Sequence, residues 1–257
     1  MIVRCALTAH VDREEALGYL GWAGQELDAD LAARLDRAVD LVERITPTGL
    51  AQVFRVDSIS CDAAGVPCAV HLAGTPLVLE SRDLAAHLGC PCEVVLMAVT
   101  LGLESERVLR RAGVRSAVDG LLVDACASSF VESAANDLSR RIAEDAAARG
   151  LRAGARFSPG YGDLPLEVQP RFIAALDAGK LIGLSVTAGN LLVPTKSITA
   201  VAGLYDAPGD AAGDSASDAP APDDALVPKA TERRCAACRL ADSCLLRKQG
   251  RTCYESR

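Results

Sequence analysis

Aromatic residues and clustered positive charge are both scarce in this sequence, and their scarcity argues against one class of partner. Only 4% of the residues are Phe, Trp or Tyr, so few rings could stack on nucleic-acid bases. The chain has a formal charge of −7, and the region expected to fold has no dense group of Lys and Arg to bind a phosphate backbone. We therefore expect no nucleic-acid partner. A neutral or cationic ligand, or a basic protein, is electrostatically easier.

Long apolar runs are also missing. No stretch of eighteen apolar residues occurs, and a membrane-spanning helix needs about that length. The first ten residues lack the apolar region and cleavage site of a signal peptide. We expect a cytoplasmic protein that does not enter a membrane. In a reducing compartment, ten cysteines favour free thiols or metal ligands over a disulfide scaffold.

Sequence signatures of common enzymes are absent as well. There is no phosphate-binding Walker loop, dinucleotide fingerprint or nucleophile elbow. The three histidines, His10, His71 and His87, do not have the spacing of metal ligands. The sequence therefore indicates none of the corresponding reaction classes.

The periodicity of apolar residues predicts a mixture of helices and strands. Helices are expected from Asp12 onward and over 28–45, 81–88, 104–112, 117–148 and 166–178. Strands are expected over 2–8, 50–56, 67–72, 77–79, 92–100, 181–186 and 197–204, with a helix start as the alternative for 92–100. Because these elements do not follow a clean βαβ repeat, the predicted class is α+β.

The composition changes abruptly near Asp206. Residues 206–231 are almost entirely Ala, Asp, Pro, Gly and Ser, which predicts a disordered acidic linker. The expected organisation is one domain with an N-terminal α+β part at 1–90 and a core at 91–205, then this linker and a tail at 232–257.

The tail concentrates thiols at short spacing, as Cys235-x2-Cys238-x5-Cys244-x8-Cys253. Four thiolates can close a zinc site or hold an iron–sulfur cluster, and the spacing does not decide between them. Two disulfides or four free thiols are the alternatives. Arginines around these cysteines could meet an acidic electron donor such as a flavodoxin, or could neutralise thiolate charge.

The loop from Arg156 to Gln169, RFSPGYGDLPLEVQ, has the composition of a ligand-binding loop. Glycine allows close approach of the backbone, proline limits its freedom, and arginine offers a planar fork for a carboxylate or phosphate. The simpler interpretation is a tight turn, with the arginine paired to a surface carboxylate.

This loop also resembles a known family. Arg156-x3-Gly160-Tyr161 is similar to the core of the S-adenosylmethionine-binding loop in the activation domain of cobalamin-dependent methionine synthase. Two further segments, 125–132 and 185–199, resemble family segments in the same order. The resemblance is clearest from about residue 92 to 204 and implies a mixed or antiparallel central sheet with flanking helices.

The resemblance also implies a function. The chain would bind S-adenosylmethionine and reactivate a cobalamin-dependent methyltransferase of the methionine synthase type, by reductive methylation of cob(II)alamin held on that partner. It would thus be a component of a methyltransferase system rather than a self-sufficient enzyme. The corrinoid must come from another chain, because the cobalamin signature Asp-x-His-x2-Gly is absent. The alternative is a non-catalytic scaffold that contacts a corrinoid protein and carries a structural zinc tail.

Individual roles follow from the matching positions. Arg156 would bind the ligand carboxylate, backbone groups of Ser158 and Gly160 the adenine, and Glu132 a hydroxyl or the ammonium, while Tyr161 would lie at the mouth toward the corrin. Glu132 could instead be a solvent-facing carboxylate. Lys196 and Ser197 would face the partner or the groove, or form only a β-turn before an edge strand.

The sequence departs from the family at three points. The family continues Gly-Tyr with Pro-Ala-Cys-Pro, whereas this chain has Gly162-Asp163-Leu164-Pro165. Asp163 would point at the sulfonium or the partner, or would cap the following helix. The family's N-terminal acidic contact and its late tyrosine have no convincing match.

Overall fold

The computed structural model describes residues 2–22 and 24–207, all within one compact unit. Among these residues, no helix combines the length and apolar character needed to cross a membrane. Two predictions fall outside the described residues: the acidic linker, apart from its first two residues, and the metal-binding tail with Cys235, Cys238, Cys244 and Cys253.

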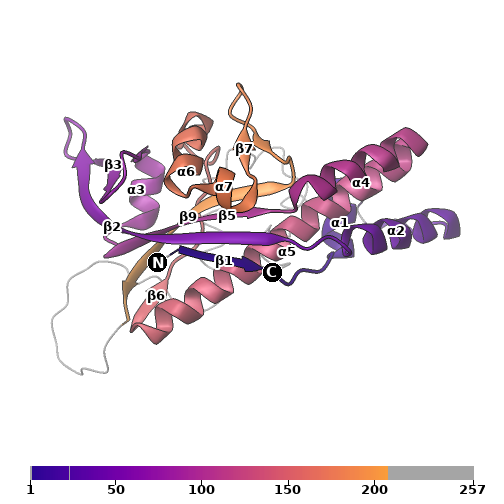
Figure 1. Cartoon of the computed structure of the whole chain (residues 1–257), viewed down its shortest axis with the longest axis horizontal. Helices are drawn as coiled ribbons and strands as arrows, with labels where there is room; N and C mark the ends of the chain where they lie inside the picture. Colours follow the sequence, from indigo (N-terminus) through magenta and orange to yellow (C-terminus); the bar gives the residue numbers. More distant parts are fainter. Residues whose placement is uncertain (1, 23, 208–257) are drawn as a thin grey trace. The chain divides into compact units, whose positions relative to one another are not determined.

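A seven-stranded antiparallel sheet forms the centre of the unit (Figure 1). Its order is β4-β3-β2-β5-β9-β6, with β1 beside β2. These strands are β1 (Ile2–Ala6), β2 (Thr48–Cys61), β3 (Pro67–Leu72), β4 (Val78–Glu80), β5 (Glu93–Thr100), β6 (Leu151–Ala153) and β9 (Ser197–Asp206). A separate two-stranded hairpin consists of β7 (Ser185–Val186) and β8 (Leu192–Val193). The predicted α+β class with an antiparallel sheet and flanking helices is confirmed.

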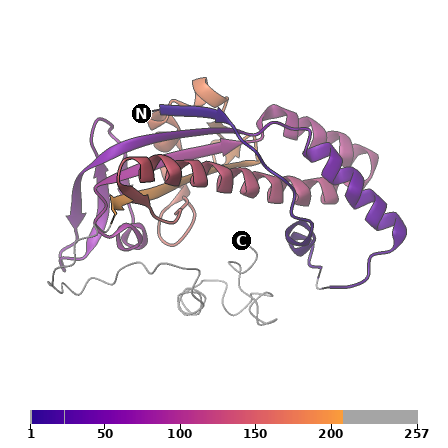
Figure 2. The same cartoon turned by 90° about the horizontal axis from the view of Figure 1, so that it is seen from below.

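Helices cover both faces of the sheet. They are α1 (Arg13–Tyr19), α2 (Ala29–Val42), α3 (Arg82–Leu88), α4 (Gly102–Arg115), α5 (Ala117–Ala148), the 3-10 turn η1 (Leu166–Val168), α6 (Gln169–Ala175) and α7 (Ala178–Ile182). The long helix α5 runs beneath the sheet in Figure 1, whereas α6 and α7 lie above it. Figure 2 shows α5 from below, with α1 and α2 near one of its ends.

Strand β5 shows why its apolar run is continuous. Val95, Met97 and Val99 belong to the core on the α5 side of the sheet. Val94 and Leu96 belong to the second core, on the opposite face. Because helices cover both faces, successive side chains are buried whichever way they point. The strand predicted at 92–100 is confirmed.

Helix starts follow local chemistry. Asp12, Asp28 and Ser81 cap α1, α2 and α3 by accepting a hydrogen bond from a backbone N–H three residues on, as acidic and hydroxyl side chains commonly do. Helix α5 begins and ends where the sequence predicts, at Ala117 and Ala148.

Two predictions near the C-terminal end of the core are wrong. The helix expected at 166–178 is divided into η1, α6 and α7, because Asp177 has a left-handed φ of 50°. The strand expected at 181–186 is reduced to β7, since Leu181 and Ile182 belong to α7. The apolar periodicity runs through the break at Asp177, so it does not reveal that the helix is interrupted there.

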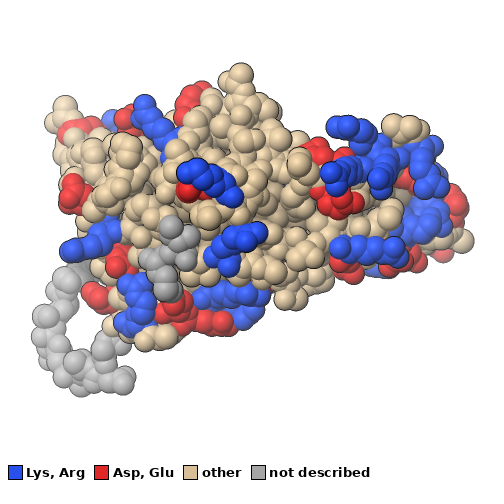
Figure 3. All heavy atoms as spheres, viewed as in Figure 1, with Lys and Arg blue, Asp and Glu red and all other residues tan. Residues whose placement is uncertain are grey.

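Charged side chains of both signs are intermixed on the surface. In the view of Figure 3, Lys and Arg gather most densely over the end that carries α2 and α4. Carboxylates partly balance them there, since Arg34 pairs with Asp119 and Arg107 with Glu104.

Helices α4 and α5 pack closely at a pair of glycines. A methyl group on Gly120 would lie 2.9 Å from the Cα of Gly113, whereas one on Gly113 would meet nothing within 4 Å. We expect Gly120→Ala to lower the free energy of unfolding by about 1–3 kcal/mol through overpacking. We expect Gly113→Ala to raise it by up to about 1 kcal/mol through helix propensity. Urea unfolding followed by circular dichroism measures both, and equal shifts of the same sign would contradict this packing.

Candidate functional site

The candidate site begins at the edge of the sheet, where β6 and the residues after it lie alongside β9. The N–H of Gly154 donates to the carbonyl of Gly203 at 2.8 Å, and Phe157 exchanges two 2.8 Å backbone hydrogen bonds with Val201. Phe157 packs against the core on the α6 side. Because alternate residues of an extended chain face opposite ways, the preceding Arg156 is directed toward α5.

Arg156 reaches two polar side chains on α5. Its Nη2 lies 2.9 Å from Asn136 Oδ1 and 3.4 Å from Glu132 Oε2. The Arg156 side chain is only 15% exposed, while that of Glu132 is 31% exposed. A largely buried guanidinium beside a more accessible carboxylate can take a ligand carboxylate and, next to it, a ligand ammonium or hydroxyl.

A second cation contacts the same face of α5. Lys196 Nζ lies 2.8 Å from Ser128 Oγ and 2.9 Å from Asp124 Oδ1, and its side chain is 13% exposed. Asp124, Ser128, Glu132 and Asn136 recur every four residues, which places them in one line along the helix. Lys196 and Arg156 thus hold segments on either side of β9 against one polar stripe, about 12 Å apart along α5 by helical rise.

The glycine-rich loop after Arg156 is ordered by its own backbone. The Gly160 N–H donates to the Leu164 carbonyl at 2.8 Å, and the Tyr161 N–H donates to the Ser158 carbonyl at 3.1 Å. Gly160 and Gly162 have φ values of 92° and 54°, in the region that only glycine adopts at little cost. The loop leaves the Tyr161 side chain 69% exposed.

Asp163 ties this loop to the start of α3. Its carboxylate accepts hydrogen bonds from the Ser81 hydroxyl and from the N–H groups of Arg82 and Asp83, the last two at 2.9 and 3.1 Å. Asp83 in turn accepts from the Asp163 N–H at 3.1 Å. Burial raises the pKa of the Asp163 carboxyl, but these hydrogen bonds outweigh it, and the pKa lies below its usual value.

This architecture is also found among solved structures. The crystal structure of the MetH reactivation domain bound to AdoHcy (S-adenosylhomocysteine) matches with a TM-score of 0.60 and 16% sequence identity, over 83% of this chain and 80% of that one. No protein-family model and no curated protein matches the sequence. The chain has the reactivation-domain fold. At this level of identity the match establishes the fold alone, and AdoHcy is the ligand of the other protein.

Within the reactivation-domain fold, the predicted site residues fall into two groups. Arg156 and Glu132 meet, with Ser158, Gly160 and Tyr161 in the loop directly after Arg156. The other predicted residues are engaged within the chain. Asp163 caps α3 rather than the helix that follows it. The Ser197 hydroxyl lies 2.7 Å from the Pro194 carbonyl oxygen, to which it donates, and 2.8 Å from the Thr100 hydroxyl.

Three contact residues on α5 are new to the site. Asn136, Ser128 and Asp124 were not singled out from the sequence, although their four-residue spacing from Glu132 marks them as its neighbours on one helix face. No group of three or more His, Cys, Asp or Glu side chains within residues 2–22 and 24–207 could hold a metal ion.

Proposed function

We propose that this protein binds S-adenosylmethionine and serves as the reactivation subunit of a cobalamin-dependent methyltransferase of the methionine synthase type. The observation that carries the proposal is the meeting of Arg156 and Glu132. These residues are 24 positions apart and come from different elements, yet they converge beside a loop stabilised by its own hydrogen bonds. The shared fold with the AdoHcy-bound reactivation domain supports this assignment.

The assigned roles use the chemistry of each group. Arg156 binds the ligand carboxylate through its planar fork, and Glu132 accepts from the ammonium or from a ribose hydroxyl. The Ser158 carbonyl and the Gly160 N–H are used inside the loop, so we assign the adenine edge to the Ser158 N–H and the Gly160 carbonyl. The exposed Tyr161 ring faces the corrinoid-bearing partner. We assign Lys196 to holding its loop against α5 beneath that partner.

The protein's contribution to the reaction is binding and orientation. The corrinoid on the partner and a one-electron donor supply the redox chemistry, and the methyl group leaves the sulfonium as the thioether forms. Holding the sulfonium at a fixed position converts an encounter into a directed transfer. This division of labour fits a chain in which no nucleophile or acid–base pair is evident from the sequence.

We also propose that the cysteine tail binds zinc or an iron–sulfur cluster and contacts a flavodoxin-like donor. A colourless, zinc-loaded protein would exclude a role of the tail as an electron relay.

Calorimetry on the full chain tests the ligand assignment. We expect S-adenosylhomocysteine to bind, and 5′-methylthioadenosine, which lacks the amino-acid end, to bind about 100-fold more weakly because it forfeits the charged contacts to Arg156 and Glu132. Equal affinity for the two compounds would contradict the assigned orientation. The proposed function would be refuted if neither compound, at millimolar concentration, gave a heat of binding or raised the melting temperature of the protein.

A further inference from the structure

A separate apolar cavity lies between α5 and the sheet. Its volume is about 180 Å³, slightly more than an apolar cavity of about 150 Å³ that accommodates benzene. The wall is made mainly of aliphatic side chains from β2, β5, β9 and the C-terminal half of α5, namely Val53, Val95, Leu204, Leu138 and Ile142. These walls suit a branched or linear hydrocarbon group of four to six carbons.

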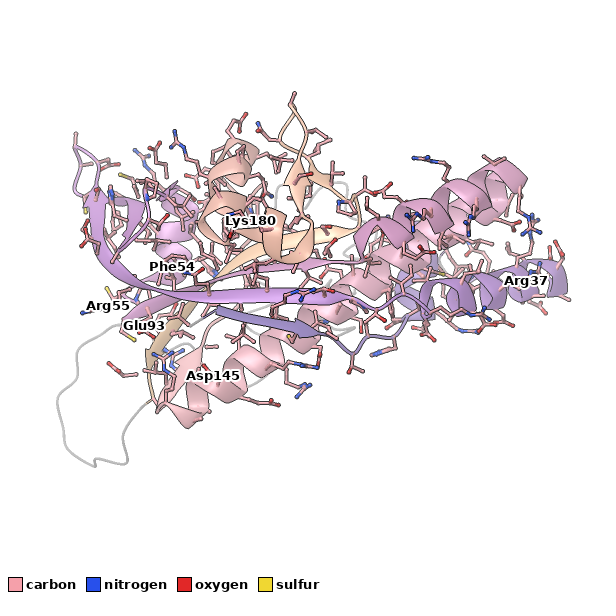
Figure 4. The ribbon with its side chains drawn as sticks, in the orientation of Figure 1. Arg37, Phe54, Arg55, Glu93, Asp145 and Lys180 are labelled. Carbon is pink, nitrogen blue, oxygen red and sulfur yellow. The ribbon has the colours of Figure 1, made fainter. Side chains whose placement is uncertain are left out.

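Two opposite charges stand among the lining residues. Arg141 and Asp145 are one helical turn apart on α5, so they lie on one face of the helix. Figure 4 shows Asp145 on the last turns of α5, below the sheet. Arg141 is held by Asp137, which accepts from its Nε at 3.0 Å and lies 2.9 Å from its Nη2. The fork is fixed in place by these contacts and retains the donors of Nη1.

Asp145 differs from nearby carboxylates on α5 in its ion pairing. Within the part of the chain that the structure describes, Asp137 and Glu144 form ion pairs closer than 4.0 Å, and Asp145 forms none. Its carboxylate is exposed and lines the cavity. Arg149, the C-cap residue of α5, interacts electrostatically with Asp145 but forms its close ion pair with Glu93. The cavity therefore combines an apolar chamber, a cation held by Asp137 and an exposed anion.

We propose that this cavity is a binding site for an aliphatic α-amino acid. The hydrocarbon side chain enters the chamber, the α-carboxylate binds Arg141, and the α-ammonium binds Asp145. One cation beside one anion matches a zwitterion. A fatty acid would leave Asp145 facing a like charge, and an alkylamine would leave the donors of Arg141 Nη1 without an acceptor from the ligand. Burying the side chain provides affinity, and the two ionic contacts select amino acids over other small hydrocarbons.

This site is independent of the proposed S-adenosylmethionine groove. The groove uses the α5 positions 132 and 136 together with Arg156, whereas the cavity uses positions 138–145 together with β1, β2, β5 and β9. Neither set shares a residue with the other. An amino acid could therefore bind here whether or not the adenosyl ligand binds at Arg156.

Cys5 provides a local measure of occupancy. Its partly buried thiol lines the cavity. After trypsin cleavage at Arg4 and Arg13, Cys5 is the only cysteine in its peptide. Alkylation of the folded full chain with iodoacetamide, followed by mass spectrometry of that peptide, reports directly on the cavity. The peptide from Val56 to Arg82 carries Cys61 and Cys68, which serve as internal controls because they lie elsewhere on the surface.

The experiment uses L-leucine as the probe. At a leucine concentration ten times the dissociation constant, alkylation of Cys5 should slow about tenfold, since only about one molecule in eleven is unoccupied. The rates of Cys61 and Cys68 should not change. 4-Methylpentanoate and isopentylamine should protect less, because the first lacks the ammonium and the second lacks the carboxylate. No protection by leucine, or equal protection by the acid or the amine, would overturn the proposal.

A pair of variants separates binding from folding. Asp145→Asn should weaken leucine binding about tenfold by removing a charged hydrogen bond. Glu144→Gln, the adjacent residue on the exposed face of α5, should leave binding unchanged. Both variants should bind S-adenosylhomocysteine as the wild type does, so failure of either proposal can be recognised separately. An unchanged leucine affinity in Asp145→Asn would refute the zwitterion assignment.

Discussion

Arg156→Ala is expected to weaken S-adenosylhomocysteine binding about 100-fold or more. A guanidinium that binds a carboxylate through two parallel hydrogen bonds is worth several kcal/mol in a partly buried site. Removal of this side chain also leaves Glu132, 31% exposed, beside the ligand carboxylate as a like charge. Arg156→Lys should recover only part of the affinity, because an ammonium keeps the charge but not the planar fork. Calorimetry of the three proteins under one buffer condition measures the series.

Arg171→Ala is the matched control for this series. Arg171 is exposed on α6, beyond the loop, and is not among the residues that contact Arg156 or Glu132 in the described chain. The variant should bind the ligand as the wild type does. Full affinity in Arg156→Ala, with Arg171→Ala also unchanged, would show that the carboxylate binds elsewhere.

Asp137→Ala is expected to lower the free energy of unfolding by about 3 kcal/mol. The Asp137 side chain is 8% exposed. It accepts from the Thr8 N–H at 3.0 Å, from Arg140 at 2.5 Å and from Arg141 at 3.0 Å. Truncation would leave the N–H of Thr8 without this acceptor and remove one of the contacts between the N-terminal segment and α5, while those of His10 with Ser133 and of Asp12 with Ser129 remain. Chemical denaturation measures the loss, and Leu121→Ala, at an exposed position of α5, is the control for a general effect on the helix.

The same carboxyl should make stability depend on pH. Burial alone would raise the pKa of Asp137. The hydrogen bonds from the Thr8 N–H and the two arginines lower it by more than burial raises it, so the pKa lies below its usual value. The stabilisation is present above the unfolded pKa of about 4 and is lost as the pH falls through the lower folded pKa. The difference in free energy of unfolding between wild type and Asp137→Asn should therefore become smaller below about pH 4. A difference that grew on acidification would contradict this assignment.

Much of the fold could be predicted because its signals are local. The caps Asp12, Asp28 and Ser81 lie next to the helices they begin, and α5 carries its apolar pattern from end to end. The errors arise where geometry depends on distant contacts. The short strands β6 and β8 were not predicted, because three and two residues carry too little pattern, and their pairing with β9 and β7 defines them.

The site was accessible from the sequence only in part. The composition of the loop at 156–169 predicts a ligand-binding turn. The role of Glu132 came only from the family resemblance, and its contact with Arg156 is known from the structure alone. Asp163 caps a helix about 80 residues earlier in the chain. No local signal reports a contact over that separation, since the chain path that brings the two segments together is set by the sheet.

Strand β5 lies between β2, which precedes it closely, and β9, which follows about 100 residues later. During synthesis on the ribosome, one hydrogen-bonding edge of this largely apolar strand therefore has no partner strand until nearly the whole unit has emerged. During that time the unpaired edge can form hydrogen bonds with other chains. Nascent chains that stop before Ser197 should consequently depend on chaperones, and co-expression with a chaperone that holds apolar segments should raise the yield of shortened forms far more than that of the full chain.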